Sequence, residues 1–139
     1  MKLTKNEYNN KWQRENKDKV SAKYKRYSIS LKGIVNALKK KDKKKFGFIS
    51  NELTVELIKQ VNERDLFCVY CKKKLEGIKS EYDHLNPFLP LSKINLVKCC
   101  KICTKSKSSA NVLEWSNFMG YKPNGIVIEL LKKQKEEKE

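Results

Sequence analysis

The chain has 139 residues, and 32 lysines and arginines against 16 aspartates and glutamates give it a formal net charge of +16. This length suits about one domain with a modest core, and the charge favours an anionic partner, either nucleic acid or an acidic membrane surface. No apolar run approaches the roughly 20 residues that span a bilayer, and the first residues lack the apolar core of a secretory signal. We therefore expect an intracellular, cytoplasmic protein.

Residues 1–50 are predicted to form a basic helical arm. They hold 16 lysines and arginines against 4 acidic residues, so most of the net charge lies here. Breaks between helices are expected near Asn16, which can cap a second helix, and between Ser28 and Ser30. Apolar residues recur at spacings of three and four, which gives each helix one apolar face. They are Tyr8, Trp12, Val20, Tyr24, Tyr27, Leu31, Ile34, Val35 and Leu38.

The densest charge in the arm is the run from Lys39 to Lys45, which Asp42 alone interrupts. Such a run can be a solvated helix end, stabilised by the negative end of the helix dipole. Aromatic residues interleaved with so many cations along the whole arm favour instead a surface that contacts phosphates. We predict DNA contacts from eight lysines: Lys39, Lys40, Lys41, Lys43, Lys44, Lys45, Lys105 and Lys107.

Residues 51–131 are predicted to form the main domain. Its first helix is expected after a cap at Ser50 and would pack as core through Leu53, Val55, Leu57, Ile58 and Val61.

Further along, the apolar pattern predicts strands at 78–85 and 95–99, a proline-bearing loop between them, and a helix around Lys105 to Lys107. The mixed-charge residues 132–139 are expected to fray.

Two Cys-x2-Cys pairs, Cys68 with Cys71 and Cys100 with Cys103, bracket the predicted strands. Each short turn presents two thiolates to the same tetrahedral ion, so the spacing predicts one structural zinc. The odd count of five cysteines and the missing signal favour metal-bound thiolates over disulfides. Neighbouring strand residues point to opposite faces, and the spacing to Cys103 selects Cys100, so Cys99 is predicted to be a small buried apolar residue.

His84 is the only histidine of the chain, and it follows Asp83 between the two cysteine pairs. A lone histidine is more often structural than chemical. Its place between the zinc ligands and beside an acidic residue gives the chemical interpretation more weight.

Five motifs occur in order in this region: Cys68-x2-Cys71, Asp83-His84-x2-Pro87, Asn95-Leu96-Val97, Cys100-x2-Cys103 and Lys107. Together they resemble the HNH nucleases of the ββα-metal fold, in the subgroup that is braced by a four-cysteine zinc. The resemblance covers roughly residues 66–118, and the basic arm resembles those of small phage and bacterial members less specifically. It implies an α+β fold with a small ββα-metal core, a four-cysteine zinc site and an N-terminal basic helical arm.

The resemblance also implies an activity, that of a metal-dependent DNA endonuclease. His84 would be the general base that takes a proton from the attacking water, and Asp83 would bind a catalytic Mg²⁺ or Mn²⁺. Asn95 would fix the loop between the strands and so orient His84. Imidazole and a hard cation with oxygen ligands suit phosphodiester hydrolysis, whereas a zinc held by four thiolates has no open position and would be structural.

One position departs from the family pattern. The family usually has asparagine after the second cysteine pair as the second protein ligand of the catalytic ion, and here the residue is Thr104. Its hydroxyl is a neutral oxygen donor with a shorter reach. Either Thr104 binds the ion, which we favour, or Asn111 reaches in from the following helix, or the protein is slow or inactive.

Two other functions stay open. A non-catalytic zinc module that only binds nucleic acid would account for the charge and for Thr104. Binding to an anionic membrane suits a basic amphipathic arm but leaves Asp83 and His84 unexplained. For the nuclease, one active site cuts one strand per encounter, so cutting both strands requires a homodimer or two successive nicks. A restriction or phage-type role follows only by analogy with the family.

Overall fold

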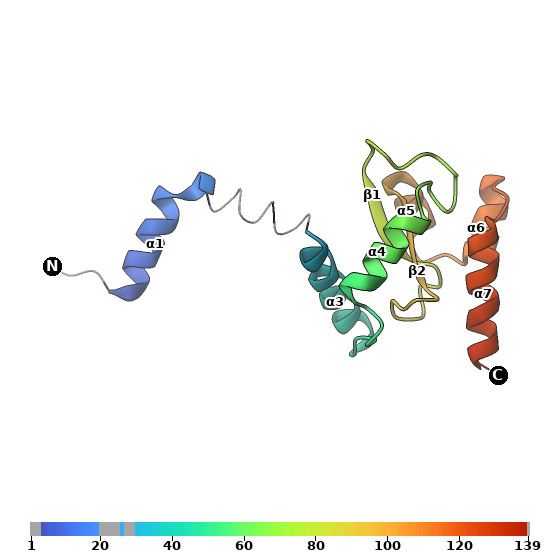
Figure 1. Cartoon of the computed structure of the whole chain (residues 1–139), viewed down its shortest axis with the longest axis horizontal. Helices are drawn as coiled ribbons and strands as arrows, with labels where there is room; N and C mark the ends of the chain where they lie inside the picture. The colour runs from blue at the N-terminus through green and yellow to red at the C-terminus, as the bar shows by residue number, and fades with distance from the viewer. Residues whose placement is uncertain (1–3, 20–25, 27–29, 139) are drawn as a thin grey trace.

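The computed structural model describes residues 4–19, 26 and 30–138. Val20, Tyr24 and Tyr27 of the predicted second helix lie outside these residues. None of the described helices is both long enough and apolar enough to span a membrane. The elements, drawn in Figure 1, are α1 (Lys5–Glu15), α3 (Leu31–Phe46), α4 (Val55–Arg64), β1 (Ser80–His84), β2 (Leu96–Cys100), α5 (Lys101–Lys107), α6 (Val112–Met119) and α7 (Gly125–Lys138).

The first helix, α1, stands apart from the other described elements (Figure 1). It begins at a capping box in which the Thr4 hydroxyl accepts from the Glu7 N–H and the Glu7 carboxylate accepts from the Thr4 N–H. It ends at Asn16, which confirms the predicted break there. None of its described residues is buried, and Tyr8 and Trp12 are exposed.

A two-stranded antiparallel hairpin leads directly into a helix at the centre of the molecule. β1 pairs with β2 from Ser80 opposite Cys100 to His84 opposite Leu96, and α5 begins one residue after β2 ends. The predicted order of strand, loop, strand and helix is confirmed. The helix begins within the second cysteine pair, because Cys100 acts as its N-cap and accepts from the Cys103 N–H through Sγ.

The two faces of this hairpin pack against different hydrophobic clusters. On one side lies the α3–α4 cluster, made of Val35, Leu38, Leu53, Leu57, Ile58, Val61, Leu91 and Leu96. On the other lies the cysteine-side cluster, which includes Cys68, Tyr70, Val97, Cys99, Cys100, Cys103, Trp115, Val127 and Leu130. Figure 1 accordingly shows α3 and α4 on one side of the hairpin and α6 and α7 on the other.

The predicted core helix is present, but it begins later than expected. Leu57, Ile58 and Val61 are buried on α4, and Leu53 is buried just before it. The N-cap is Thr54 rather than Ser50, because the Thr54 hydroxyl accepts from the Leu57 N–H, as an N-cap does in the first turn. The Ser50 hydroxyl instead accepts from the Glu52 N–H in the turn that precedes the helix.

Two segments expected outside the main domain belong to its packing. α3 was assigned to the basic arm, yet it buries Val35, Leu38 and Asp42 against the rest of the chain. The C-terminal residues expected to fray continue α7 through Lys138. Gln134 anchors this helix, because its side-chain amide is buried and donates to the Ile94 carbonyl and to Asn95 Oδ1.

Leu38→Ala tests whether α3 is part of the folded body. Removal of a buried leucine side chain is expected to lower the free energy of unfolding by about 2–5 kcal/mol. Lys41→Ala, an exposed position on the same helix, is the control and should change it by less than about 0.5 kcal/mol. Urea denaturation of the zinc-loaded protein measures both values. Equal, small effects would show that α3 does not pack as described.

Candidate functional site

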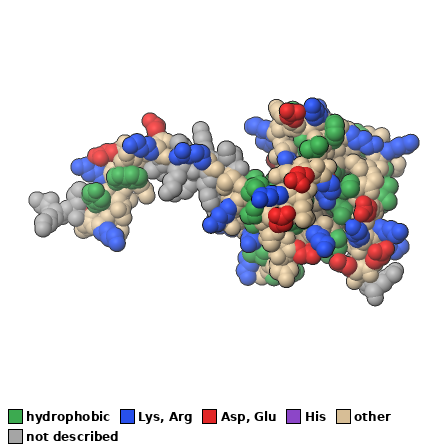
Figure 2. Space-filling view, in the orientation of Figure 1, with side chains coloured by type: hydrophobic (Ala, Val, Ile, Leu, Met, Phe, Trp, Pro, Cys, Tyr) green, Lys and Arg blue, Asp and Glu red, His purple; other side chains and the backbone are tan. Residues whose placement is uncertain are grey.

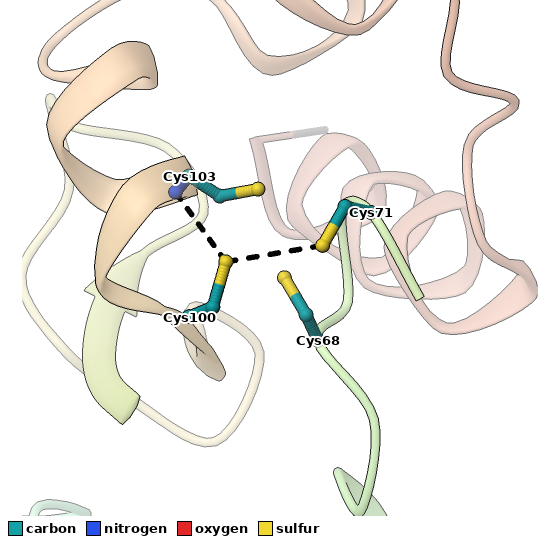
Figure 3. A group of neighbouring side chains, drawn as sticks. All are labelled: Cys68, Cys71, Cys100 and Cys103. Atoms are coloured by element: carbon teal, nitrogen blue, oxygen red, sulfur yellow. Dashed lines mark hydrogen bonds between the residues drawn. The ribbon is translucent and has the colours of Figure 1, made fainter. Parts of the chain in front are cut away.

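Four cysteine side chains converge between the turn after α4 and the start of α5 (Figure 3). Their sulfur atoms all lie within 4.8 Å of one another, and the Cys71 and Cys100 sulfurs are 3.8 Å apart. Four sulfurs at the usual zinc distance of about 2.3 Å, in a tetrahedron, are separated by about 3.8 Å. The cluster therefore fits a structural zinc, as predicted, and buried Cys99 is not part of it.

Local backbone geometry presents these thiols. Cys68 and Lys72 form a tight turn, in which the Lys72 N–H donates to the Cys68 carbonyl and Lys72 adopts a φ of 65°. Burial raises the pKa of the Cys68 and Cys103 thiols. Burial also acts on Cys100, but hydrogen bonds from Cys103 and the neighbouring thiols outweigh it and lower its pKa. Zinc must displace the thiol protons, so its affinity should rise with pH.

Cys103→Ser separates the proposed ligand from its non-ligand neighbour. The variant is expected to lose most of the zinc, because one thiolate of four is replaced by a hydroxyl, whereas Cys99→Ala should retain about one ion per chain. Elemental analysis after dialysis measures the metal content. Zinc retained in full by Cys103→Ser, or lost from Cys99→Ala, would contradict the ligand assignment.

His84 lies at the end of β1 with its ring directed at α3. Its Nε2 atom is 2.6 Å from Oδ1 of Asp42, and the Phe46 ring centroid lies 5.9 Å from its own. The His84 side chain is 18% exposed, whereas Asp42 is fully buried. The second Asp42 oxygen accepts from the Leu91 N–H at 2.7 Å. The only histidine is thus held by a buried carboxylate and still reaches the surface.

Asp42 is a site residue that the sequence analysis missed. It was treated as an interruption of the lysine run. A signal was present, because Val35, Leu38 and Asp42 follow one another at spacings of three and four residues. That periodicity places Asp42 on the buried face of the helix.

Asp83, the neighbour of His84, has quite different partners. Its Oδ2 atom accepts from the Tyr70 hydroxyl at 2.6 Å and lies 3.1 Å from Nζ of Lys107. Burial, and next the negative charge of Asp83, raise the pKa of Tyr70 well above its ordinary value, so the phenol keeps its proton. Consecutive strand residues point to opposite faces, which explains why Asp83 faces the cysteine-side cluster while His84 faces α3.

Lys107 was predicted to contact DNA, but the structure gives it an internal position. The residue is 1% exposed, and its ammonium also donates to the backbone carbonyl of His84. It therefore pairs with the partly exposed Asp83 carboxylate and holds the end of β1, and it is not available at the surface.

The residues predicted to bind a catalytic ion do not form a ready site for one. The Thr104 hydroxyl donates to the Cys100 carbonyl and lies 2.8 Å from the Cys99 sulfur. Asn111 caps α6 by accepting from two backbone N–H groups. Asp83 is already paired with an ammonium, which opposes a second cation. Within residues 4–19, 26 and 30–138, the four cysteines are the only group of three or more His, Cys, Asp and Glu side chains that could hold one metal ion.

Asn95 holds the loop that joins the strands, as the sequence led us to expect. This fully buried amide donates to the carbonyls of Asn86, Leu89 and Pro90 and accepts from the Asn86 N–H. The loop begins just after His84, so these bonds restrain the backbone beside the imidazole.

The remaining predicted DNA contacts differ in their exposure. Lys40, Lys41, Lys43, Lys44 and Lys105 are exposed, and Lys39 is half-buried. Lys45 donates to the Pro87 carbonyl at 2.7 Å, so its ammonium is engaged within the molecule. Figure 2 shows basic side chains along α1 and at several places on the main body, with acidic side chains between them.

A groove of about 710 Å³ runs along the outer side of α3. Gly33, Ala37 and Ile49 contribute apolar lining, and lysines 39, 40, 43 and 44 also line it. The exposed side of α3 is therefore strongly basic.

Comparison of the chain with protein families, with curated proteins and with solved structures finds no match. What the geometry establishes is an antiparallel hairpin followed by a helix, with a four-cysteine cluster across its end. His84 is the last residue of β1, and its side chain is partly exposed.

Proposed function

We propose that the protein is a metal-dependent DNA endonuclease of the HNH type, a phosphodiester hydrolase in which His84 is the general base. One observation carries the proposal: the only imidazole of the chain is partly exposed at the end of β1, with one nitrogen held by a buried carboxylate. A fixed imidazole that reaches solvent is what a general base for an attacking water requires. The motif resemblance to HNH nucleases supports the same role.

The charge distribution around the histidine supports a nucleic-acid substrate. The helix that carries Asp42 exposes Lys40, Lys43 and Lys44 to solvent. Lysines near phosphates displace condensed counterions and so draw DNA to the surface regardless of its sequence. Lys40 and Lys44 each stand two positions from Asp42, on roughly the opposite face of α3, so a strand held on them must also pass around the helix to reach the His84 ring.

The proposal includes a divalent ion, Mg²⁺ or Mn²⁺. When bound, such an ion offsets the negative charge that develops on the scissile phosphate and the leaving oxygen. Asp83 and Thr104 do not form a ready site for the ion in the described arrangement, because Asp83 Oδ2 is engaged with Tyr70 and Lys107 and the Thr104 hydroxyl donates to the Cys100 carbonyl. The requirement for an ion is therefore a property to measure, and no residue is assigned to hold it.

The contacts that occupy Asp83 and Thr104 favour a second function. A zinc-containing module that binds nucleic acid without cutting it has no need of a catalytic ion. The ion pair of Asp83 with the buried Lys107 would then be purely structural, joining β1 to α5.

His84→Ala decides between the two functions. With Mg²⁺ or Mn²⁺, the wild-type protein is expected to nick supercoiled plasmid, and the variant should be slower by about 10²–10⁴-fold, because the general base is removed. Ser109→Ala, an exposed position in the same domain, is the control and should nick at the wild-type rate. Zinc content and circular dichroism confirm that each variant is folded.

Two results would count against the nuclease. Nicking that survives in His84→Ala removes the histidine from the mechanism. Salt-sensitive DNA binding by the wild-type protein without cleavage, in either ion, supports the binding module instead.

A further inference from the structure

We infer that Asp42 is a positioning residue for His84, which keeps the imidazole proton on Nε2 and leaves Nδ1 as the proton acceptor. The inference rests on the proposed role of His84 as general base. Asp42 touches the ring but not the reacting water, so it acts through the histidine.

The hydrogen bonds of Asp42 determine the direction of the contact. Oδ2 accepts from the Leu91 N–H, which can only donate, and Oδ1 lies 2.6 Å from His84 Nε2. A carboxylate offers acceptors only, so Nε2 must be the donor in this contact. In the neutral ring the other nitrogen then carries the lone pair that can take a proton from water.

The burial of Asp42 favours a single orientation of the His84 ring. The residue has no exposed surface, and an ionised carboxylate out of water is unfavourable unless hydrogen bonds compensate for it. Leu91 and His84 each supply one of these bonds. Rotation of the ring away from Asp42 would leave a buried oxygen unsatisfied, so the imidazole is held in one orientation.

Two neighbours of Asp42 hold the same region. The Lys45 ammonium donates to the Pro87 carbonyl, three residues after His84, and the Phe46 ring lies beside the imidazole. The end of α3 thus makes three contacts here. Phe46 lies beside the imidazole ring, Asp42 is bonded to its Nε2 atom, and Lys45 is bonded to the loop that follows His84.

The position of Asp42 in the lysine run gives α3 two functions. Lys40, Lys43 and Lys44 face solvent, where DNA would bind, while Asp42 faces inward to the histidine. α3 therefore carries both the exposed lysines and the carboxylate that contacts the base.

Asp42→Asn reverses the donor at this contact without changing the shape of the side chain. The asparagine oxygen must face the Leu91 N–H, since the amide group would place two donors opposite each other. Its NH₂ group then faces Nε2, which has to become an acceptor, and the ring proton moves to Nδ1. The nitrogen that served as the base is now protonated.

Nitrogen-15 spectroscopy of selectively histidine-labelled protein tests this directly, because the chain has one histidine. At a pH where the ring is neutral, wild-type protein should show a proton on Nε2 that is protected from exchange by Asp42. Asp42→Asn should show the proton on Nδ1, and its nicking rate should fall by about 10²–10⁴-fold with zinc retained. Glu56→Gln, the same charge change at an exposed site on α4, should alter neither.

The outcomes separate this inference from the proposed function. An unchanged tautomer in a folded Asp42→Asn protein overturns the positioning role, whatever the activity. A wild-type ring protonated on Nδ1, or with an Nε2 proton in free exchange with water, overturns it even if the variant does not fold. A tautomer change in a protein that never cuts DNA upholds the contact and removes the nuclease.

Discussion

The four-cysteine cluster is the constraint on which the rest of the described structure depends. It joins the turn after α4 to the start of α5, and the hairpin spans the distance between them. Two strands of five residues are too few to be stable alone in water. A metal that closes a loop of about thirty residues removes much of the freedom of the unfolded chain, so zinc binding and folding of this region are expected to be one process.

The hairpin divides the neighbouring residues Asp83 and His84 between two environments. Asp83 joins Lys107 and Tyr70 on the cysteine side, where the three brace β1 against α5 and the turn. His84 turns to α3 and meets Asp42. The basic helix is therefore a component of the site and not a separate binding arm. One helix supplies both the carboxylate that holds the imidazole of β1 and the exposed lysines, because α3 packs Asp42 against His84 and leaves Lys40, Lys43 and Lys44 in solvent.

The sequence predicted those features that depend on residues close together in the chain. The cysteine spacing identified the cluster, and strand alternation separated Cys99 from Cys100. The contact between Asp42 and His84 joins residues 42 positions apart, and no local signal pairs them. The burial of Lys107 likewise depends on distant partners, the Asp83 carboxylate and the His84 carbonyl. The end of α7 is ordered because Gln134 reaches Asn95, and the start of α4 was misplaced because Ser50 and Thr54 are both competent caps.

Titration of duplex DNA into histidine-labelled protein, with zinc bound and no other divalent ion, tests most directly whether His84 faces a phosphate. The ring nitrogen signals should shift together with the backbone amides of Lys40 and Lys43, because a strand that His84 cuts must reach the imidazole as well as the lysines of α3. Shifts of those amides with an unmoved histidine signal would show that DNA binds away from the ring, and the assignment of His84 as a catalytic base would fail.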